Sequence, residues 1–430
     1  MKSVKKQQKK YIIESMEDKM KIIAKHAAGQ VLKRDGFQIS SEAKAAKKLD
    51  PTIVDGTLGT FYYEDSLFKG FKSVDKVMKH LNDEEFYSYS TSDGGEVATN
   101  AILNWVFRNR RSEIEKELTV KLIPTPGGTG AITASVFNSL DPGEIFLIPD
   151  LCWGPYIGIA TNRGYKVEKY SLFQGNKFNL NDFIKKANAI IEKQGKLVTI
   201  INDPCNNPTG YSMKNSELAS LIEYFNSKND IPIVLLFDVA YIDFAVEGMD
   251  KTREKYVELT KCNDNIVTCI CFSASKTFAV YGQRLGAQII LSKNKDQAIE
   301  YFNAGNFTAR NTWSNCNKAV LSMLIKMDKD KELQKRFLKE LNVVIKILKK
   351  RAKIFLTEAK ACKLKVHPYK GGFFATIPVK DNIKVLDMVR DEEKIYLLPF
   401  EKSVRIALCS IPCKELHGVA NRIKSIVDKE

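Results

Sequence analysis

Histidine is scarce in this sequence, with 4 residues in 430. These four histidines (His26, His80, His367 and His417) are too far apart to show the spacing of a metal-binding motif. The nine cysteines include no CxxC pair, so the sequence indicates neither a zinc site nor a regular disulfide framework. We therefore predict no metal site, and we interpret the cysteines as reduced, mostly buried thiols of a cytosolic protein.

Long apolar runs are also missing, because no stretch approaches the roughly 20 residues that a membrane-spanning helix needs. Residues 1–10 are basic, but residues 11–28 form an amphipathic mixture that includes Glu14, Glu17 and Asp18. A secretory signal or an organellar transit peptide would carry fewer acidic residues. We expect a cytoplasmic protein that does not bind membranes.

Positive charge is in excess, at a formal +16. The basic residues are spread along the chain, and the densest run, 326–365, alternates with apolar residues at helical spacing. Such a run is typical of the solvated face of packed helices, so we expect no nucleic-acid partner. A positive field would equally favour small anionic ligands.

The middle of the chain alternates between strand-like and helix-like segments. Strands are predicted at 165–172, 197–202 and 233–237, with helices at 179–193 and 213–227 between them. This alternation indicates a parallel, doubly wound α/β sheet, whose ligands lie beyond the carboxyl ends of the strands. At 430 residues the chain suits two domains.

A concentrated set of reactive side chains follows the apolar strand predicted at 266–272. Ser273 and Ser275 offer hydroxyls, Lys276 an amine, and Arg284 a planar cation. An amine can form a Schiff base with an aldehyde, while hydroxyls and a guanidinium bind phosphate. An aldehyde cofactor with a phosphate tail would use the whole set, although a surface Lys–Arg pair would also fit this stretch taken alone.

Three other stretches suit the same ligand. The run Gly127-Gly128-Thr129-Gly130 precedes a helix predicted at 132–140, where backbone N–H groups favour anions. Asp238 ends an apolar strand, where a carboxylate needs a partner such as a protonated pyridine nitrogen. Trp153 follows the strand predicted at 144–149 and is either a core residue or a stacking surface.

Together with the Asn207-Pro208-Thr209-Gly210 turn, these motifs resemble class I aminotransferases of the aspartate and aromatic type. The resemblance runs in family order from about Val54 to Arg405. It implies pyridoxal 5'-phosphate as cofactor and the fold-type I architecture, an α/β fold with a mostly parallel doubly wound sheet and a smaller α+β domain from both termini. We expect an N-terminal arm and part of the small domain at 1–68, the large domain at 69–340, and the rest of the small domain at 341–430.

The resemblance also implies roles for individual residues. Lys276 would hold the cofactor and move the substrate's proton, Asp238 would bind the ring nitrogen, and Tyr241 would tune the ring oxygen. The cofactor contacts would come from Tyr89, Gly127, Gly128, Thr129, Trp153, Asn207, Asp238, Tyr241, Ser273, Ser275, Lys276 and Arg284. The substrate contacts would come from Gly59, Asn207, Arg310 and Arg405.

Four positions depart from the family pattern and border the predicted site: Tyr156, Asn206, Cys316 and Val404. Aspartate enzymes usually carry histidine at the position of Tyr156, where it supports the carboxylate that binds the ring nitrogen. These departures bear on specificity and on the support of the cofactor.

The expected activity is transfer of an amino group from aspartate, or another dicarboxylic or aromatic L-amino acid, to a 2-oxo acid such as 2-oxoglutarate. The resemblance further implies a homodimer with shared active sites. Tyr89, with Tyr87 as the alternative, and Arg310 would reach the neighbouring subunit's site. An aromatic aminotransferase and a β-eliminating lyase are the alternatives on the same fold. A non-enzymatic cofactor-binding or nucleic-acid-binding protein is the alternative from another class.

Overall fold

The computed structural model describes residues 22–24, 27–31 and 35–430. The chain divides into two compact units, 1–35 and 36–430, and the second is described here by itself. Four apolar residues of the amphipathic stretch at 11–28 lie outside the described residues: Ile12, Ile13, Met16 and Met20. The second unit begins with helix α2 (Gly36–Leu49), which buries Ile39 and Ala43.

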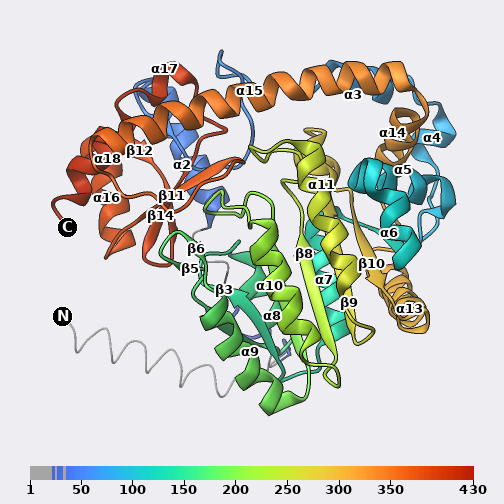
Figure 1. Cartoon of the computed structure of the whole chain (residues 1–430). Helices are drawn as coiled ribbons and strands as arrows, with labels where there is room; N and C mark the ends of the chain where they lie inside the picture. The colour runs from blue at the N-terminus through green and yellow to red at the C-terminus, as the bar shows by residue number, and fades with distance from the viewer. Residues whose placement is uncertain (1–21, 25–26, 32–34) are drawn as a thin grey trace. The chain divides into compact units, whose positions relative to one another are not determined.

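A seven-stranded sheet forms the centre of this unit (Figure 1). β10 runs antiparallel to both of its neighbours, and the other strand pairs are parallel. Strands β7, β9 and β10 are buried at every position, as expected for a sheet covered on both faces. The strands in spatial order are β2 (Thr119–Thr125), β10 (Gly286–Ser292), β9 (Ile266–Ser273), β8 (Ile233–Asp238), β7 (Leu197–Asn202), β3 (Ile145–Pro149) and β4 (Lys166–Tyr170).

Helices cover both faces of the sheet because neighbouring strand residues point to opposite sides. Leu236 packs in a core with residues of α7 (Gly127–Ser139), α8 (Pro155–Thr161) and α13 (Lys295–Thr312). Leu235, one residue earlier, packs in the other core with residues of α9 (Leu180–Gln194), α10 (Asn215–Asn226) and α11 (Met249–Glu258). The sheet is therefore doubly wound, and the predicted α/β fold is confirmed.

The C-terminal segments build a separate hydrophobic core, to which Val54 near the start of the unit contributes. Its strands form an antiparallel sheet, β11 (Phe374–Pro378), β14 (Ser403–Ala407) and β13 (Leu398–Phe400), and a parallel pair, β1 (Val54–Asp55) and β12 (Ile395–Tyr396). Its helices are α16 (Asn382–Glu393), α17 (Cys413–Leu416) and α18 (Val419–Val427).

One long helix, α15 (Lys331–Ala361), connects the two cores and is orange in Figure 1. Its first half contributes Phe337 and Leu341 to the core of the large sheet, and its second half contributes Phe355 and Ala359 to the C-terminal core. The guanidinium of Arg351 lies between these halves and donates hydrogen bonds to backbone carbonyls of both Tyr62 and Cys409, at 2.8 and 2.7 Å.

Shorter elements complete the described chain. The helices are α3 (Lys72–Lys79), α4 (Asp83–Tyr87), α5 (Gly95–Phe107), α6 (Arg111–Glu117), α12 (Ala274–Thr277) and α14 (Lys318–Lys329). The 3-10 turns are η1 (Arg108–Arg110), η2 (Leu259–Lys261) and η3 (Tyr281–Gln283), and a small hairpin joins β5 (Phe173–Gln174) to β6 (Lys177–Phe178). Within the part of the chain that the structure describes, no helix is long and apolar enough to cross a membrane.

The predicted helix after the glycine run differs from the observed one. The sequence placed its start at residue 132, whereas α7 begins at Gly127. The glycines therefore form the first turn of the helix instead of a loop before it. Gly127 has φ +75° and enters the helix from a backbone conformation that residues with a side chain rarely adopt.

Candidate active site

Lys276 lies at the carboxyl end of the large sheet, on the single-turn helix α12 that directly follows β9. The Ser273 hydroxyl caps this helix by accepting a hydrogen bond from the Ser275 backbone N–H. The neighbouring strands β7 and β8 end at Asn202 and Asp238, which are partners in register. Because β7, β8 and β9 run parallel, the polar residues at their carboxyl ends lie at the same edge of the sheet.

The Lys276 amine is enclosed by a carbonyl and aromatic rings. Nζ donates a 2.9 Å hydrogen bond to the Gly59 carbonyl and lies 4.7 Å from the centroid of the Tyr281 ring. The rings of Tyr241 and Phe373 are each 5.9 Å away. The pKa of Lys276 is lowered to about 8, mainly by burial; Cys409 opposes this shift, and the cations Arg405 and Arg284 add to it. About a tenth of the amine is therefore neutral at pH 7, far more than for an ordinary lysine.

Arg284 and the start of α7 form a cradle beside Lys276. The Arg284 Nη1 donates to the Ser275 hydroxyl at 3.1 Å and to the Tyr281 carbonyl at 2.8 Å. A Cβ on Gly127 would lie 2.3 Å from the Arg284 Nη2, and one on Gly128 would lie 3.2 Å from the Ser273 Cβ. The close approach requires glycine at position 127, and at position 128 a side chain would be crowded. The cradle joins two hydroxyls, a guanidinium and a helix N-terminus, a combination that suits a phosphate group.

A carboxylate lies at the end of β8, the strand that pairs directly with β9, which precedes Lys276. Asp238 is buried and accepts hydrogen bonds from the Tyr156 hydroxyl and from the Ala240 backbone N–H, the latter at 3.0 Å. Burial raises the pKa of Asp238 from 3.8 to about 6, although both hydrogen bonds act to lower it. The partly buried ring of Trp153 packs edge-on against Tyr156, with centroids 5.5 Å apart.

Arg405 is buried on β14 and reaches across to the loop after β7. Its Nη1 donates to the Asn207 side-chain oxygen at 2.9 Å, and its Nη2 donates to the Thr57 carbonyl at 2.5 Å. The guanidinium lies 3.9 Å from the centroid of the Phe374 ring. Burial lowers the pKa of Arg405 to about 10. Its buried Nε has no hydrogen-bond partner among the described residues, which leaves a donor for a carboxylate.

Residues 61–423 match the family model for aminotransferases of class I and II. The chain belongs to this family. An aromatic-amino-acid aminotransferase of Escherichia coli K12 is 21% identical over 384 residues, covering 87% of this chain and 93% of that protein. A mitochondrial aspartate aminotransferase of Dictyostelium discoideum is 25% identical over 283 residues, and the match covers 64% of each protein.

Solved aminotransferase structures share the fold of this chain. An aminotransferase of Anaerococcus prevotii has 28% sequence identity and a TM-score of 0.91, and the match covers 95% of this chain and 100% of that one. An aromatic-amino-acid aminotransferase of Burkholderia pseudomallei, solved with covalently bound pyridoxal phosphate, has 21% identity and a TM-score of 0.77 over 94% of this chain and 100% of that one.

Other residues that were predicted to belong to the site of this aminotransferase are Tyr241 and Thr129. Tyr241 is buried and packs edge-on against Phe373 and Phe374, at centroid distances of 5.2 and 5.8 Å. Burial raises the pKa of Tyr241 well above its ordinary value, with Arg405 opposing that rise. Thr129 is exposed in the first turn of α7.

Two predicted residues of the aminotransferase lie at the surface instead. Tyr89 is 87% exposed. Arg310 is exposed on α13, and its Nη1 donates to the Ser314 hydroxyl at 2.9 Å. Within the described part of the chain, neither residue contacts Lys276, Arg284 or Arg405.

Several neighbours of the Lys276 amine were not predicted from the sequence. Tyr281, five residues after Lys276, has the closest ring, and its hydroxyl accepts a 3.2 Å hydrogen bond from the Phe61 backbone N–H. In the sequence, only its position five residues after Lys276 could have marked Tyr281 as a neighbour of the amine. Phe373 and Cys409 come from the distant C-terminal segments, where no local pattern marks them.

Proposed function

We propose that this aminotransferase, whose cofactor is pyridoxal 5'-phosphate, moves an amino group from an aspartate-like dicarboxylic or an aromatic L-amino acid to a 2-oxo acid such as 2-oxoglutarate. The observation that carries the proposal is the Lys276 amine. It is partly buried, its pKa is lowered to about 8, and it lies in the field of Arg405 and Arg284. An amine of this kind can attack an aldehyde and can later accept a proton.

The residues present fit this cofactor at two points. The cradle of Gly127, Gly128, Ser275 and Arg284 suits the phosphate group because a side chain on either glycine would fill it. The Asp238 carboxylate suits a protonated pyridine nitrogen, since a buried carboxylate gains from a cationic donor.

Further contacts to the cofactor complete this assignment. We assign the phosphate also to Ser273 and Thr129, the ring oxygen to Asn207 and Tyr241, and the face of the ring to Trp153. When bound, the cofactor supplies an electron sink for the pair left at the substrate's Cα.

The chain's own groups then hold the substrate and move its proton. Arg405 would bind the α-carboxylate, with Nε as the donor that protein groups leave free. Asn207 fixes the guanidinium of Arg405. Once released from the aldehyde, the Lys276 Nζ would take the proton from Cα, and its pKa of about 8 keeps enough neutral amine for this step near pH 7. The Gly59 carbonyl, which accepts from Nζ, would hold the amine beside the substrate.

Tyr89 and Arg310 lead to a proposal about assembly. Both are exposed in the single chain, and the family resemblance gives them roles in a neighbouring subunit's site. We therefore propose a homodimer with shared active sites, in which Tyr89 contacts the partner's phosphate and Arg310 the distal carboxylate of the partner's substrate. We also propose a cytoplasmic location and domain limits at residues 68 and 340.

Visible spectroscopy and peptide mapping test the proposal. The purified protein should bind pyridoxal 5'-phosphate with absorbance in the visible range, and borohydride reduction should leave the cofactor on the peptide that contains Lys276. A screen of amino donors with 2-oxoglutarate should show activity with aspartate or aromatic amino acids. Retained activity in Lys276→Ala would exclude the assigned base, and a colourless protein that refuses the cofactor would exclude the proposed function.

A further inference from the structure

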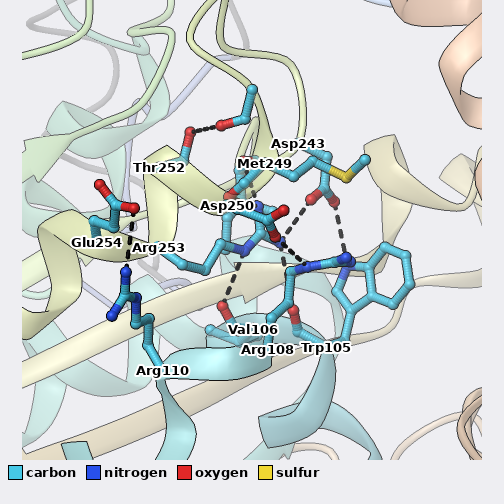
Figure 2. Close-up of polar contacts among 12 residues, drawn as sticks. Trp105, Val106, Arg108, Arg110, Asp243, Met249, Asp250, Thr252, Arg253 and Glu254 are labelled. Atoms are coloured by element: carbon cyan, nitrogen blue, oxygen red, sulfur yellow. Dashed lines mark hydrogen bonds and ion pairs between the residues drawn. The ribbon is translucent and has the colours of Figure 1, made fainter. Parts of the chain in front are cut away.

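A buried ion pair lies next to Thr277, the residue that follows Lys276. Arg253 of α11 and Asp243 of the loop after β8 form a pair at 2.6 Å, and both side chains are completely buried. Figure 2 shows the Asp243 carboxylate between the guanidinium of Arg253 and the indole nitrogen of Trp105. None of these three residues has a role in the proposed chemistry.

Asp243 links this pair to the helix of the catalytic lysine. One carboxylate oxygen, Oδ1, accepts from Arg253. The other, Oδ2, accepts from the Thr277 hydroxyl at 2.7 Å and from the Trp105 Nε1 at 3.2 Å. Thr277 is the residue after Lys276, and it is fully buried. Asp243 itself lies two residues after Tyr241, so one carboxylate is tied to both segments that carry the proposed catalytic groups.

Arg253 holds the loop in turn. Its five N–H groups all have acceptors, because Nε donates to the Val106 carbonyl, Nη1 to the carbonyls of Ile242 and Met249, and Nη2 to Asp243 and the Trp105 carbonyl. The carbonyl of Ile242 is the immediate neighbour of Tyr241. Arg253 therefore contacts the loop between β8 and α11 at two consecutive residues, Ile242 and Asp243.

Helix α12 needs such an external support. It has four residues, and a single turn is too short to be stable by its own hydrogen bonds. A buried ion pair contributes little net stability compared with well-packed apolar residues of the same volume. What this pair does provide is a rigid, fully satisfied acceptor at one fixed point behind α12.

We propose that Asp243 and Thr277 are positioning residues, which hold the Lys276 amine in place for cofactor binding and for proton transfer. This proposal rests on the proposed function of Lys276. Asp243 acts through the Thr277 hydroxyl, and Arg253 fixes Asp243. The expected role is geometric, because small displacements of a reacting group cost large factors in rate.

Thr277→Val tests the proposal because it removes the hydroxyl and keeps the shape of the side chain. The holoenzyme variant should lose about tenfold in kcat with a change in KM below about twofold. The isotope effect on kcat for substrate deuterated at Cα should rise, since proton transfer becomes slower. The dissociation constant for pyridoxal 5'-phosphate, followed by protein fluorescence, should rise several-fold. Thr277→Ser, which keeps the hydroxyl, should restore all three values.

Thr252→Val is the matched control. Thr252 is also a fully buried threonine, its hydroxyl donates to the Gly248 carbonyl at 2.9 Å, and it lies beside Arg253 without contacting Asp243 (Figure 2). This variant should lose thermal stability comparably and keep its kinetic constants, isotope effect and cofactor affinity. If Thr277→Val behaves like Thr252→Val in these three measurements, the proposal is wrong.

A second variant covers the case in which Thr277→Val does not fold. Thr277→Ala also lacks the hydroxyl but leaves space for water beside the carboxylate, and it should show the same defects. Borohydride trapping of the wild-type protein separates the two levels of inference. If the cofactor is not found on Lys276, the proposed function fails; if it is found there and the variants equal the control, only the positioning role fails.

Discussion

The hydroxyl of Tyr156 donates a hydrogen bond to the carboxylate of Asp238, and both side chains are buried. Burial raises the pKa of Asp238 to about 6, and the hydrogen bond from Tyr156 is the first of the two interactions that oppose this rise. The tyrosine thus takes the place of the histidine that the family pattern favours. It supports the carboxylate with a neutral donor.

Replacing Tyr156 with phenylalanine should move the pH dependence of the enzyme. Without the donor the pKa of Asp238 rises further above 6, so the ionised form that would pair with a protonated ring is lost at higher pH. A hydrogen bond to a charged group contributes about 1.5–3 kcal/mol, which corresponds to a shift of about one pH unit or more. The acidic limb of kcat/KM against pH should move upward by that amount.

Tyr224→Phe is the control for this change. Tyr224 is buried and its hydroxyl donates to the Asn188 side chain at 3.0 Å, away from Asp238. In the Tyr224→Phe variant, the acidic limb of kcat/KM against pH should coincide with that of the wild type. An unchanged limb in Tyr156→Phe would contradict the role given to that hydroxyl.

Asp238 should destabilise the cofactor-free protein at neutral pH. Its pKa is raised from 3.8 to about 6 on folding, so the folded state holds the proton more tightly than the unfolded state. The resulting stability is full below pH 4 and is lost as pH rises through about 6. Asp238→Asn should therefore match the wild type near pH 4 and exceed it at pH 8 by up to about 3 kcal/mol. Urea unfolding of the cofactor-free proteins at both pH values measures this, and equal stabilities at pH 8 would contradict it.

Gly127→Ala should weaken cofactor binding. The new methyl group would lie 2.3 Å from the Arg284 Nη2, so the guanidinium must leave its place beside Ser275. We expect a loss of at least about tenfold in affinity for pyridoxal 5'-phosphate, or about 1.4 kcal/mol. Equilibrium titration followed by visible absorbance is the measurement.

Gly143→Ala is the control that distinguishes the effect of the Arg284 contact from the effect of backbone strain. Gly143 also has positive φ, at +92°, but a Cβ there meets nothing within 4 Å. Both variants should lose stability from the unfavourable backbone conformation, by about 1–2 kcal/mol. A similar loss of cofactor affinity in both would show that the Arg284 contact is not the cause.

Arg310→Gln should change the choice of donor. If Arg310 binds the distal carboxylate of a substrate in the partner's site, its removal should lower kcat/KM for aspartate by about 30-fold or more, equivalent to about 2 kcal/mol. The value for phenylalanine should change by less than about threefold, because that side chain has no distal charge. Arg390→Gln, at a partly exposed arginine paired with Asp387 and Asp391, is the control for lost positive charge. Equal losses for both donors would remove the dicarboxylate assignment.

The sequence predicted those parts of the site that lie on continuous motifs. Gly127, Gly128, Ser275 and Arg284 come from two short stretches, and the structure brings them together because β10 pairs with both β2 and β9. Asp238 was predictable for a different reason, since a carboxylate at the end of a buried strand is costly unless a ligand or a side chain pairs with it.

Contacts between distant segments were not predictable in this way. Asp243 and Thr277 are 34 residues apart, and neither stands in a pattern that marks it. Tyr156 was identified as a departure from the family, but its hydrogen bond to Asp238 depends on how α8 packs on the sheet. Val404, another departure from the family, is buried and pairs with Ile377 in the antiparallel sheet next to Arg405.

Helix α15 has a consequence for how the molecule loses its structure. Its 31 residues run without interruption from the core that carries Lys276 to the core that carries Arg405. If one core unfolded alone, helix α15 would have to break, or the apolar residues of one half of it would become exposed to water. The two cores, and with them the segments that carry Lys276 and Arg405, should therefore unfold in a single cooperative transition with heat or denaturant.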